Sequence, residues 1–179
     1  MRFVFPTLAY KEKAAAYIQE FIEHGSEING TGSLDRYLRE STYEEWLDKV
    51  IRAVDIANIA PPKVPALTYF CVREEDDRIV GMVNIRLALN DFLREEGGHI
   101  GYSVRPSERG KHYATEMMNK ALDVCRRIGM TGVIVTCDRE NIPSARVIQN
   151  CGGRLDAEFY SRTFEETIQR YIIDIHAYE

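Results

Sequence analysis

One run of residues, from His99 to Ile128, most constrains how this chain can fold. It begins with a strand-forming segment, His99–Val104, passes through a short loop around Gly110 and enters a helix directly. Apolar residues recur in that helix at every third or fourth position, which predicts one buried face. They are Ala114, Met117, Met118, Ala121, Leu122, Cys125 and Ile128. A helix that begins directly after a strand presents its unpaired first N–H groups at the end of that strand.

A second strand is predicted after this helix. Gly129 ends the helix, and Gly132–Cys137 is a short apolar run typical of a buried strand. Strand, helix and strand in this order predict a right-handed crossover between two parallel strands. Further strands are predicted over 67–73, 78–89, 154–163 and 169–177, with a short helix over 142–151. The predicted fold class is therefore α+β, or mixed α/β, with a mixed, mostly antiparallel sheet flanked by helices.

The first 66 residues are predicted to be mainly helical. One helix is expected over 7–24, and a second begins at a capping box, Ser41–Glu44, and continues to the prolines at 61 and 62. No linker-like composition divides the chain. We expect a single domain over 1–179, in which 1–66 is a helical substrate-side segment and 67–179 is the core.

Composition excludes several classes of function. The 23 basic and 28 acidic residues leave a net charge of -5, which disfavours a broad nucleic-acid-binding face. No apolar run reaches the roughly 18 residues of a membrane span, and the first residues lack a signal-peptide pattern. The four cysteines form no CxxC pair and no Cys/His zinc pattern, so no metal site is expected. Reduced, buried thiols in a cytoplasmic protein are the expectation.

The loop before the helix at 113 has the chemistry of an anion site. The first N–H groups of a helix and its dipole attract negative charge, and phosphate suits this position. Gly110 allows the backbone to approach a ligand closely, and Arg109 and Lys111 add positive charge. The residues predict a bound phosphate or pyrophosphate, with an ordinary strand-to-helix connection as the alternative. The absence of GKS or GKT excludes a nucleotide P-loop.

The segment Arg109–Ala114 resembles the pyrophosphate motif R/Q-x-x-G-x-G/A of the GNAT superfamily of acyl-CoA N-acyltransferases. His112 occupies the position where the central Gly is usual. Asn141–Val147 resembles the N-x-x-S-x-R/K-V segment of branches that acetylate ribosomal proteins or polyamines. The segment Gly97–Pro106 resembles an uncharacterised bacterial acetyltransferase branch.

This resemblance implies a GNAT-like fold in which the two central parallel strands splay apart around acetyl-CoA. The backbone of Val104 would pair with the pantetheine arm and hold the oxyanion. Residues 109–115 would hold the diphosphate, and Asn141 would lie near the pantetheine. The implied cofactor-binding residues are Val104, Arg109, Gly110, Lys111, His112, Tyr113, Ala114, Thr115, Asn141 and Ser144. A homodimer through the C-terminal strands is common in the family.

The implied reaction needs a base, because a primary amine is about 99.9% protonated at pH 7 and attacks only when neutral. His99 is the first candidate and Glu108 the second; His112 is the third. The alternatives are a hydrogen-bonded ring for His99, a solvated loop carboxylate for Glu108 and a solvent-exposed ring for His112.

The proton donor to the leaving thiolate is harder to assign. At the position where the family often has a Tyr, this chain has Ile148. Tyr113, Tyr102 and Tyr160 are possible substitutes, and a packed aromatic ring is the alternative for each. Because a thiol has a pKa near 8.5, thiolate can also leave without a donor.

Two functions follow from these features. The first is an N-acetyltransferase that moves acetyl from acetyl-CoA to a primary amine, of a small molecule or a peptide or protein N-terminus, by direct attack without an acyl-enzyme. The alternative is a non-catalytic acyl-CoA-binding sensor. Acidic residues expected to attract a cationic amine, or to form an ordinary acidic surface, are Asp35, Glu40, Asp91, Glu95 and Glu96.

Overall fold

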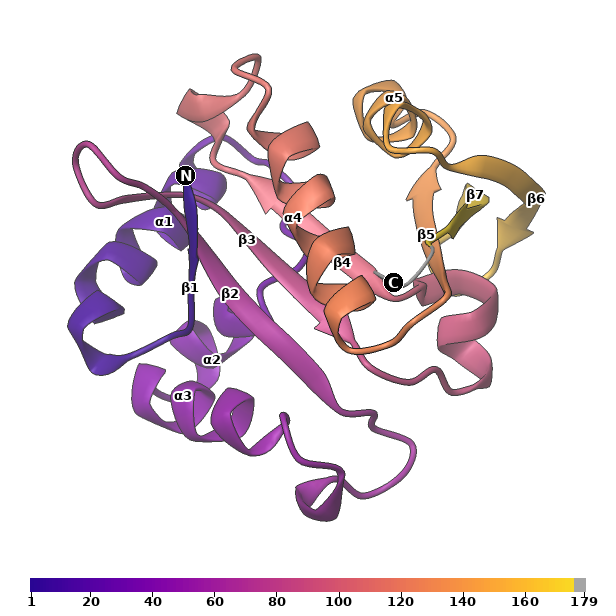
Figure 1. Ribbon diagram of the computed structural model, residues 1–179. Coiled ribbons are helices and arrows are strands. Elements are labelled where there is room, and N and C mark those ends of the chain that lie inside the picture. The colour runs from indigo at the N-terminus through magenta and orange to yellow at the C-terminus, as the bar shows by residue number, and fades with distance from the viewer. Residues whose placement is uncertain (176–179) are drawn as a thin grey trace.

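A four-stranded antiparallel sheet forms one part of the molecule (Figure 1). The computed structural model describes residues 1–175. The sheet has the order β1-β2-β3-β4, formed by β1 (Arg2–Val4), β2 (Ala66–Arg73), β3 (Arg78–Arg86) and β4 (Ile100–Val104). The predicted hairpin of β2 and β3 is confirmed. Strand β1 was not predicted, because three residues are too few to show an alternating pattern.

A second sheet of three strands lies beside the first. Its order is β5-β7-β6, from β5 (Gly132–Asp138), β6 (Arg154–Ser161) and β7 (Glu166–Asp174), and both pairings are antiparallel. The last strand was predicted to reach Ala177, which lies outside the described residues. Strands β6 and β7 form a hairpin, and the other edge of β7 pairs with β5.

Helices cover both faces of the first sheet (Figure 1). On one face lie α1 (Lys11–Glu23), α2 (Leu34–Glu40) and α3 (Tyr43–Arg52), and on the other lies α4 (Tyr113–Arg127); α5 (Ile142–Asn150) lies beside the second sheet. Short helical turns are η1 (Leu8–Tyr10), η2 (Ile56–Asn58), η3 (Leu93–Gly97) and η4 (Pro106–Glu108).

The start of α3 differs by one residue from the predicted capping box. The Oγ1 atom of Thr42, not of Ser41, accepts the N–H of Glu45 at 3.2 Å. The helix also ends at Arg52, well before the prolines that were expected to stop it. The apolar stripe beyond this point is largely exposed, so no buried face sustains a longer helix.

Alternation along β3 divides the buried side chains between two cores. Met82 packs with Tyr17, Phe21, Trp46 and Phe70 under the N-terminal helices. On the opposite face of the sheet, alternate β3 residues pack with α4 and the second sheet; this core includes Val83, Ile85, Met117, Leu122 and Val133. Both faces of the first sheet are therefore buried, and the helical segment shares the sheet with the rest of the chain.

Hydrogen bonds join the two sheets at the start of β4. The N–H of His99 donates to the carbonyl oxygen of Ile134 at 2.7 Å, just before β4 begins. Gly98 has a φ of 63°, and a Cβ there would lie 2.7 Å from the same oxygen, so the approach requires glycine. Beyond this junction β4 and β5 form no ladder with each other. The predicted splayed strand pair is therefore confirmed.

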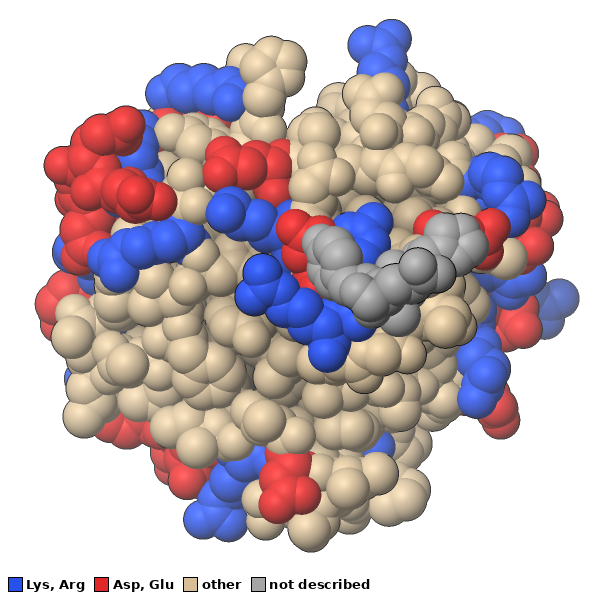
Figure 2. All heavy atoms as spheres, viewed as in Figure 1, with Lys and Arg blue, Asp and Glu red and all other residues tan. Residues whose placement is uncertain are grey.

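Charge is mixed on the face that Figure 2 shows. Basic and acidic side chains alternate over it, and no broad basic surface forms there. Within residues 1–175, no helix is both long and apolar enough to cross a bilayer.

Candidate active site

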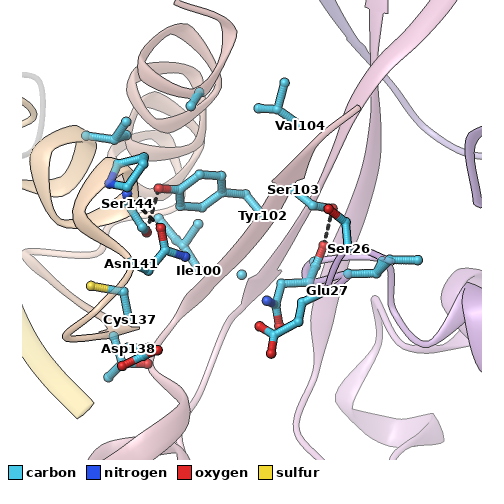
Figure 3. Close-up of a pocket in the computed structure, with 18 of the residues that line it drawn as sticks. Ser26, Glu27, Ile100, Tyr102, Ser103, Val104, Cys137, Asp138, Asn141 and Ser144 are labelled. Atoms are coloured by element: carbon cyan, nitrogen blue, oxygen red, sulfur yellow. Dashed lines mark hydrogen bonds between the residues drawn. The ribbon is translucent and has the colours of Figure 1, made fainter. Parts of the chain in front are cut away.

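A cleft of about 1220 Å³ opens between β4 and β5 (Figure 3). Its lining comes from β4 and β5, from the loop before α4 and from the first turns of α4 and α5. The connection between α1 and α2, residues 25–30, closes the side opposite to β5. The cleft therefore joins the predicted anion site to surfaces from both sheets.

Strand β4 turns main-chain hydrogen-bonding groups toward this cleft. The N–H of Arg105 donates to Val80 and the N–H of Arg86 donates to His99, both at 2.8 Å. In a β-strand the main-chain N–H groups of successive residues point to opposite sides. Because these bonds direct every second residue of β4 toward β3, the N–H groups of Tyr102 and Val104 point away from β3 toward β5. In the described part of the chain, no strand pairs with β4 on that side. An extended chain of amides fits against this edge.

The loop before α4 has two left-handed residues. Gly110 has a φ of 76°, and nothing lies within 4 Å of the position its Cβ would take. His112 has a φ of 63° and lies directly before α4. His is one of the few residues other than Gly that adopt this region, which fits a position where Gly is usual.

The basic side chains of this loop are occupied by the protein itself. Arg109 donates to the carbonyl oxygen of Val104 at 3.3 Å and to Ser26 Oγ at 3.1 Å, with its guanidinium over the Phe21 ring. Lys111 Nζ donates to Glu108 at 2.8 Å, and Lys111 is absent from the cleft lining. The groups left for an anion are the main-chain N–H groups of residues 110 and 112–115, all of which line the cleft.

Glu108 is buried, with 3% of its surface exposed, which contradicts the interpretation of a solvated loop carboxylate. Its carboxylate contacts Arg73 Nη1 at 2.9 Å, Lys111 Nζ at 2.8 Å and Arg78 Nε at 3.5 Å. Burial alone would raise the pKa of Glu108, but these three cations outweigh burial and lower it. These contacts favour a structural role for Glu108, in which its carboxylate holds the loop in place, and disfavour a role in proton transfer.

His99 joins the two sheets through its ring. Its Nδ1 atom accepts the N–H of Ile134 at 2.9 Å, so the neutral ring carries its proton on Nε2. Burial, with Arg86 and Arg94 nearby, lowers the pKa of His99. His99 is not among the described residues that line the cleft. The structure therefore favours the alternative, a ring fixed by a hydrogen bond, over the general base.

Tyr102, Asn141 and Ser144 lie on the wall of the cleft opposite residues 26–27 (Figure 3). The hydroxyl of Tyr102, from β4, lies 2.9 Å from Ser144 Oγ at the start of α5. Asn141 caps α5 by accepting the Ser144 N–H at 3.1 Å. Tyr113 begins α4 and lines the cleft, whereas Ile148 is fully buried.

Five carboxylates line the cleft, and only two of them were predicted from the sequence. Glu96 and Glu108 were predicted; Glu27, Asp138 and Glu166 were not. Figure 3 shows Glu27 and Asp138 on opposite walls. Burial and the charges of Asp138 and Glu27 raise the pKa of Glu166. No local pattern indicates the three carboxylates that were missed, because they come from a loop and two strands of the second sheet. The other four acidic residues expected here lie outside the lining.

An open strand edge beside a main-chain anion site defines a class of protein: an enzyme that binds an acyl-CoA between two splayed strands. Residues 6–154 match the acetyltransferase (GNAT) domain, and the chain belongs to this family. It is an acyltransferase whose acyl donor is acetyl-CoA. No curated protein matches the sequence significantly.

Solved structures share the fold at low sequence identity. A ribosomal-protein-S5-alanine acetyltransferase from Vibrio fischeri has a TM-score of 0.72 and 17% identity, over 99% of this chain and 94% of that one. The microcin C7 self-immunity acetyltransferase MccE, solved with acetyl-CoA and AMP, has a TM-score of 0.72 and 17% identity, over 97% and 91%. Mycobacterium smegmatis RimJ, solved with CoA-disulfide, gives 0.66 and 21%, over 92% and 78%.

Proposed function

We propose that this acetyltransferase is an N-acetyltransferase, which transfers acetyl to a primary amine of a small molecule or of a peptide or protein N-terminus. The observation that carries the proposal is the group of carboxylates that line the cleft, because these carboxylates attract a protonated amine. The amine attacks directly, and no described residue needs to carry the acetyl group. Free thiols at all four cysteines support a cytoplasmic setting, and the free edge at β6 supports a homodimer through the C-terminal strands.

Residues of this chain divide the work of the reaction. Acetyl-CoA supplies the activated thioester. The N–H groups of 110 and 112–115 hold the diphosphate, and the N–H of Val104 donates to the thioester oxygen as negative charge develops, an effect typically worth a few kcal/mol. Glu166 takes the proton of the ammonium, directly or through water, because its raised pKa lies closer to that of an amine. Tyr102 places its hydroxyl beside Ser144, one helical turn before Ile148 in α5, where it can serve the leaving thiolate in place of the usual Tyr.

The placement of the diphosphate is tested with Gly110→Asp. An added carboxylate beside bound phosphates should weaken CoA affinity at least about 10-fold, measured by calorimetry. Gly129→Asp is a matched control, since Gly129 also has a positive φ (83°) and free space around its Cβ position, but lies at the other end of α4. Equal CoA affinity of the two folded variants would show that the diphosphate lies elsewhere.

A non-catalytic acyl-CoA sensor is the second candidate function. The substitution of Ile for the usual Tyr at 148 favours it. Thiol release from acetyl-CoA over a panel of amines separates the two functions: tight CoA binding without turnover on any amine indicates a sensor.

A further inference from the structure

Arg86 is a cation in the wall of the cleft that forms no ion pair with any residue in 1–175. It is the last residue of β3, and it lines the same cleft as Glu27, Glu96, Asp138 and Glu166. None of these carboxylates approaches it as a partner; its described hydrogen bonds run to main-chain oxygens. Burial without a counter-charge is costly for a guanidinium, and burial lowers the pKa of Arg86.

Only one nitrogen of Arg86 is engaged with the described protein. Nη1 donates to the carbonyl oxygens of Gly97 and Gly98, at 2.6 and 2.8 Å. These bonds hold the side chain at the junction of the two sheets. Nη2 lies 3.7 Å from the position of a Cβ at Gly101, beside β4. Nε and Nη2 together keep three N–H donors in a planar fork that matches a carboxylate.

We propose that Arg86 binds the carboxylate of the acceptor, which makes the acceptor a free amino acid. The proposal rests on the N-acetyltransferase function above and names its substrate class. The acceptor's ammonium then faces the carboxylates of the cleft, while its own carboxylate pairs with the guanidinium. A zwitterion neutralises both sets of charges in the same cleft, whereas a simple amine leaves Arg86 unpaired. In the reaction the ammonium first loses one proton to a carboxylate or water, and the neutral amine nitrogen then bonds to the acetyl carbon. As the C–S bond breaks, the nitrogen loses a second proton to give the amide, and the leaving thiolate takes up a proton, directly or through water, to give CoA.

The test compares matched acceptors. A panel of common α-amino acids is assayed for thiol release from acetyl-CoA, each beside its carboxamide and its decarboxylated amine. We expect kcat/KM for the best free acid to exceed that of its carboxamide by about 10- to 100-fold, as for a charge-assisted hydrogen-bonded pair. Arg86→Gln should bring this ratio close to one, and Arg86→Lys should restore part of it. CoA affinity reports on the folding of each variant.

A binding measurement keeps the inference separate from catalysis. N-acetyl amino acids and their carboxamides are titrated by calorimetry into the CoA-saturated protein. Preferential binding of the acids that is lost in Arg86→Gln supports the inference, whether or not any amine is turned over. An absence of turnover on every amine would overturn the N-acetyltransferase function instead. Turnover of amines with equal rates for acids and amides overturns the inference and leaves the function standing. An equal loss on both acceptors in Arg86→Gln assigns Arg86 only to holding the 97–98 turn.

Discussion

At the residue scale, His112 shows that a departure from a motif can leave the structure of the motif intact. The residue takes the left-handed conformation usually given to Gly, and α4 begins directly after it. In the proposed anion site the amides of the loop and of the first helical turn bind the ligand, so the site does not require the His112 side chain. The consequence is that the identity of residue 112 affects the backbone more than it affects the chemistry.

We expect His112→Gly to keep CoA affinity within about twofold and His112→Val to lose about 1 kcal/mol of folding stability or more. A β-branched residue is strained at a φ of 63°, whereas Gly adopts it freely. Urea denaturation and calorimetry measure the two quantities. A large loss of CoA affinity in a folded His112→Gly protein would mean that the imidazole itself binds the ligand.

Tyr102 provides a second prediction at this scale. Burial raises the pKa of Tyr102 to about 12, so its hydroxyl keeps its proton at neutral pH and can stabilise a leaving thiolate by donating a hydrogen bond to it. Tyr102→Phe should lower kcat by roughly 10- to 100-fold with little change in KM for acetyl-CoA. Tyr160→Phe is the control, because Tyr160 is exposed. An unchanged kcat in Tyr102→Phe would mean that Tyr102 does not assist the leaving thiolate.

At the scale of elements, those with a strong local pattern could be predicted and those without one could not. The spacing of apolar residues predicted α4, and its residues Met117, Met118, Ala121, Leu122 and Cys125 are buried. Neither β1 nor α2 nor η3 was predicted, since each is short and is held by contacts with distant residues. The junction of the two sheets depends on His99 and Ile134, which no periodicity connects.

The candidate site divides in the same way. Residues 109–115 are contiguous, so a local pattern sufficed to predict this segment, and all of it except Lys111 lines the cleft. The partners of the basic side chains were missed, because Glu108, Ser26 and Val104 reach them only in the folded chain. The basic side chains that suggested an anion site in the sequence are therefore paired within the protein, and the groups left open to the cleft are main-chain N–H groups.

The junction between elements is tested with two variants of His99. An Asn side chain can accept the Ile134 N–H in place of Nδ1, whereas Ala cannot. We expect His99→Asn to retain most turnover and stability, and His99→Ala to lose about 1–3 kcal/mol because a buried N–H is left unpaired. Thermal melts and thiol-release assays measure both. If both variants lost turnover equally while remaining stable, His99 would act as the base after all.

At the scale of the whole molecule, Glu20 connects the N-terminal helices to the loop before α4. Its carboxylate accepts hydrogen bonds from Arg105 and from the Ser107 N–H, and it lies 3.4 Å from Arg78. Burial alone would raise the pKa of Glu20, but the Ser107 and Arg105 hydrogen bonds outweigh it and hold the pKa at about 2. One end of α1 is thereby fixed to the segment that leads into the anion site.

The pH dependence of stability follows from this lowered pKa. The unfolded carboxyl titrates near 4.3, so its contribution is fully present above that pH and is lost as pH falls toward 2. We expect Glu20→Gln to lose roughly 2–3 kcal/mol at pH 7, with the difference from the unaltered protein shrinking below pH 4. Glu23→Gln, one turn along α1 and exposed, should match the unaltered protein. If the stability difference between Glu20→Gln and the unaltered protein stayed constant down to pH 2, the lowered pKa of Glu20 would not be its cause.

The parting of the two sheets has a consequence for the protein as a whole. The seven strands of the described residues form two sheets, and the gap between these sheets lies between β4 and β5. In the proposed complex the amide chain of the acyl donor pairs with the open edge of β4 inside this gap. Binding the donor would then add one more hydrogen-bonded chain to the β-structure before any chemistry begins.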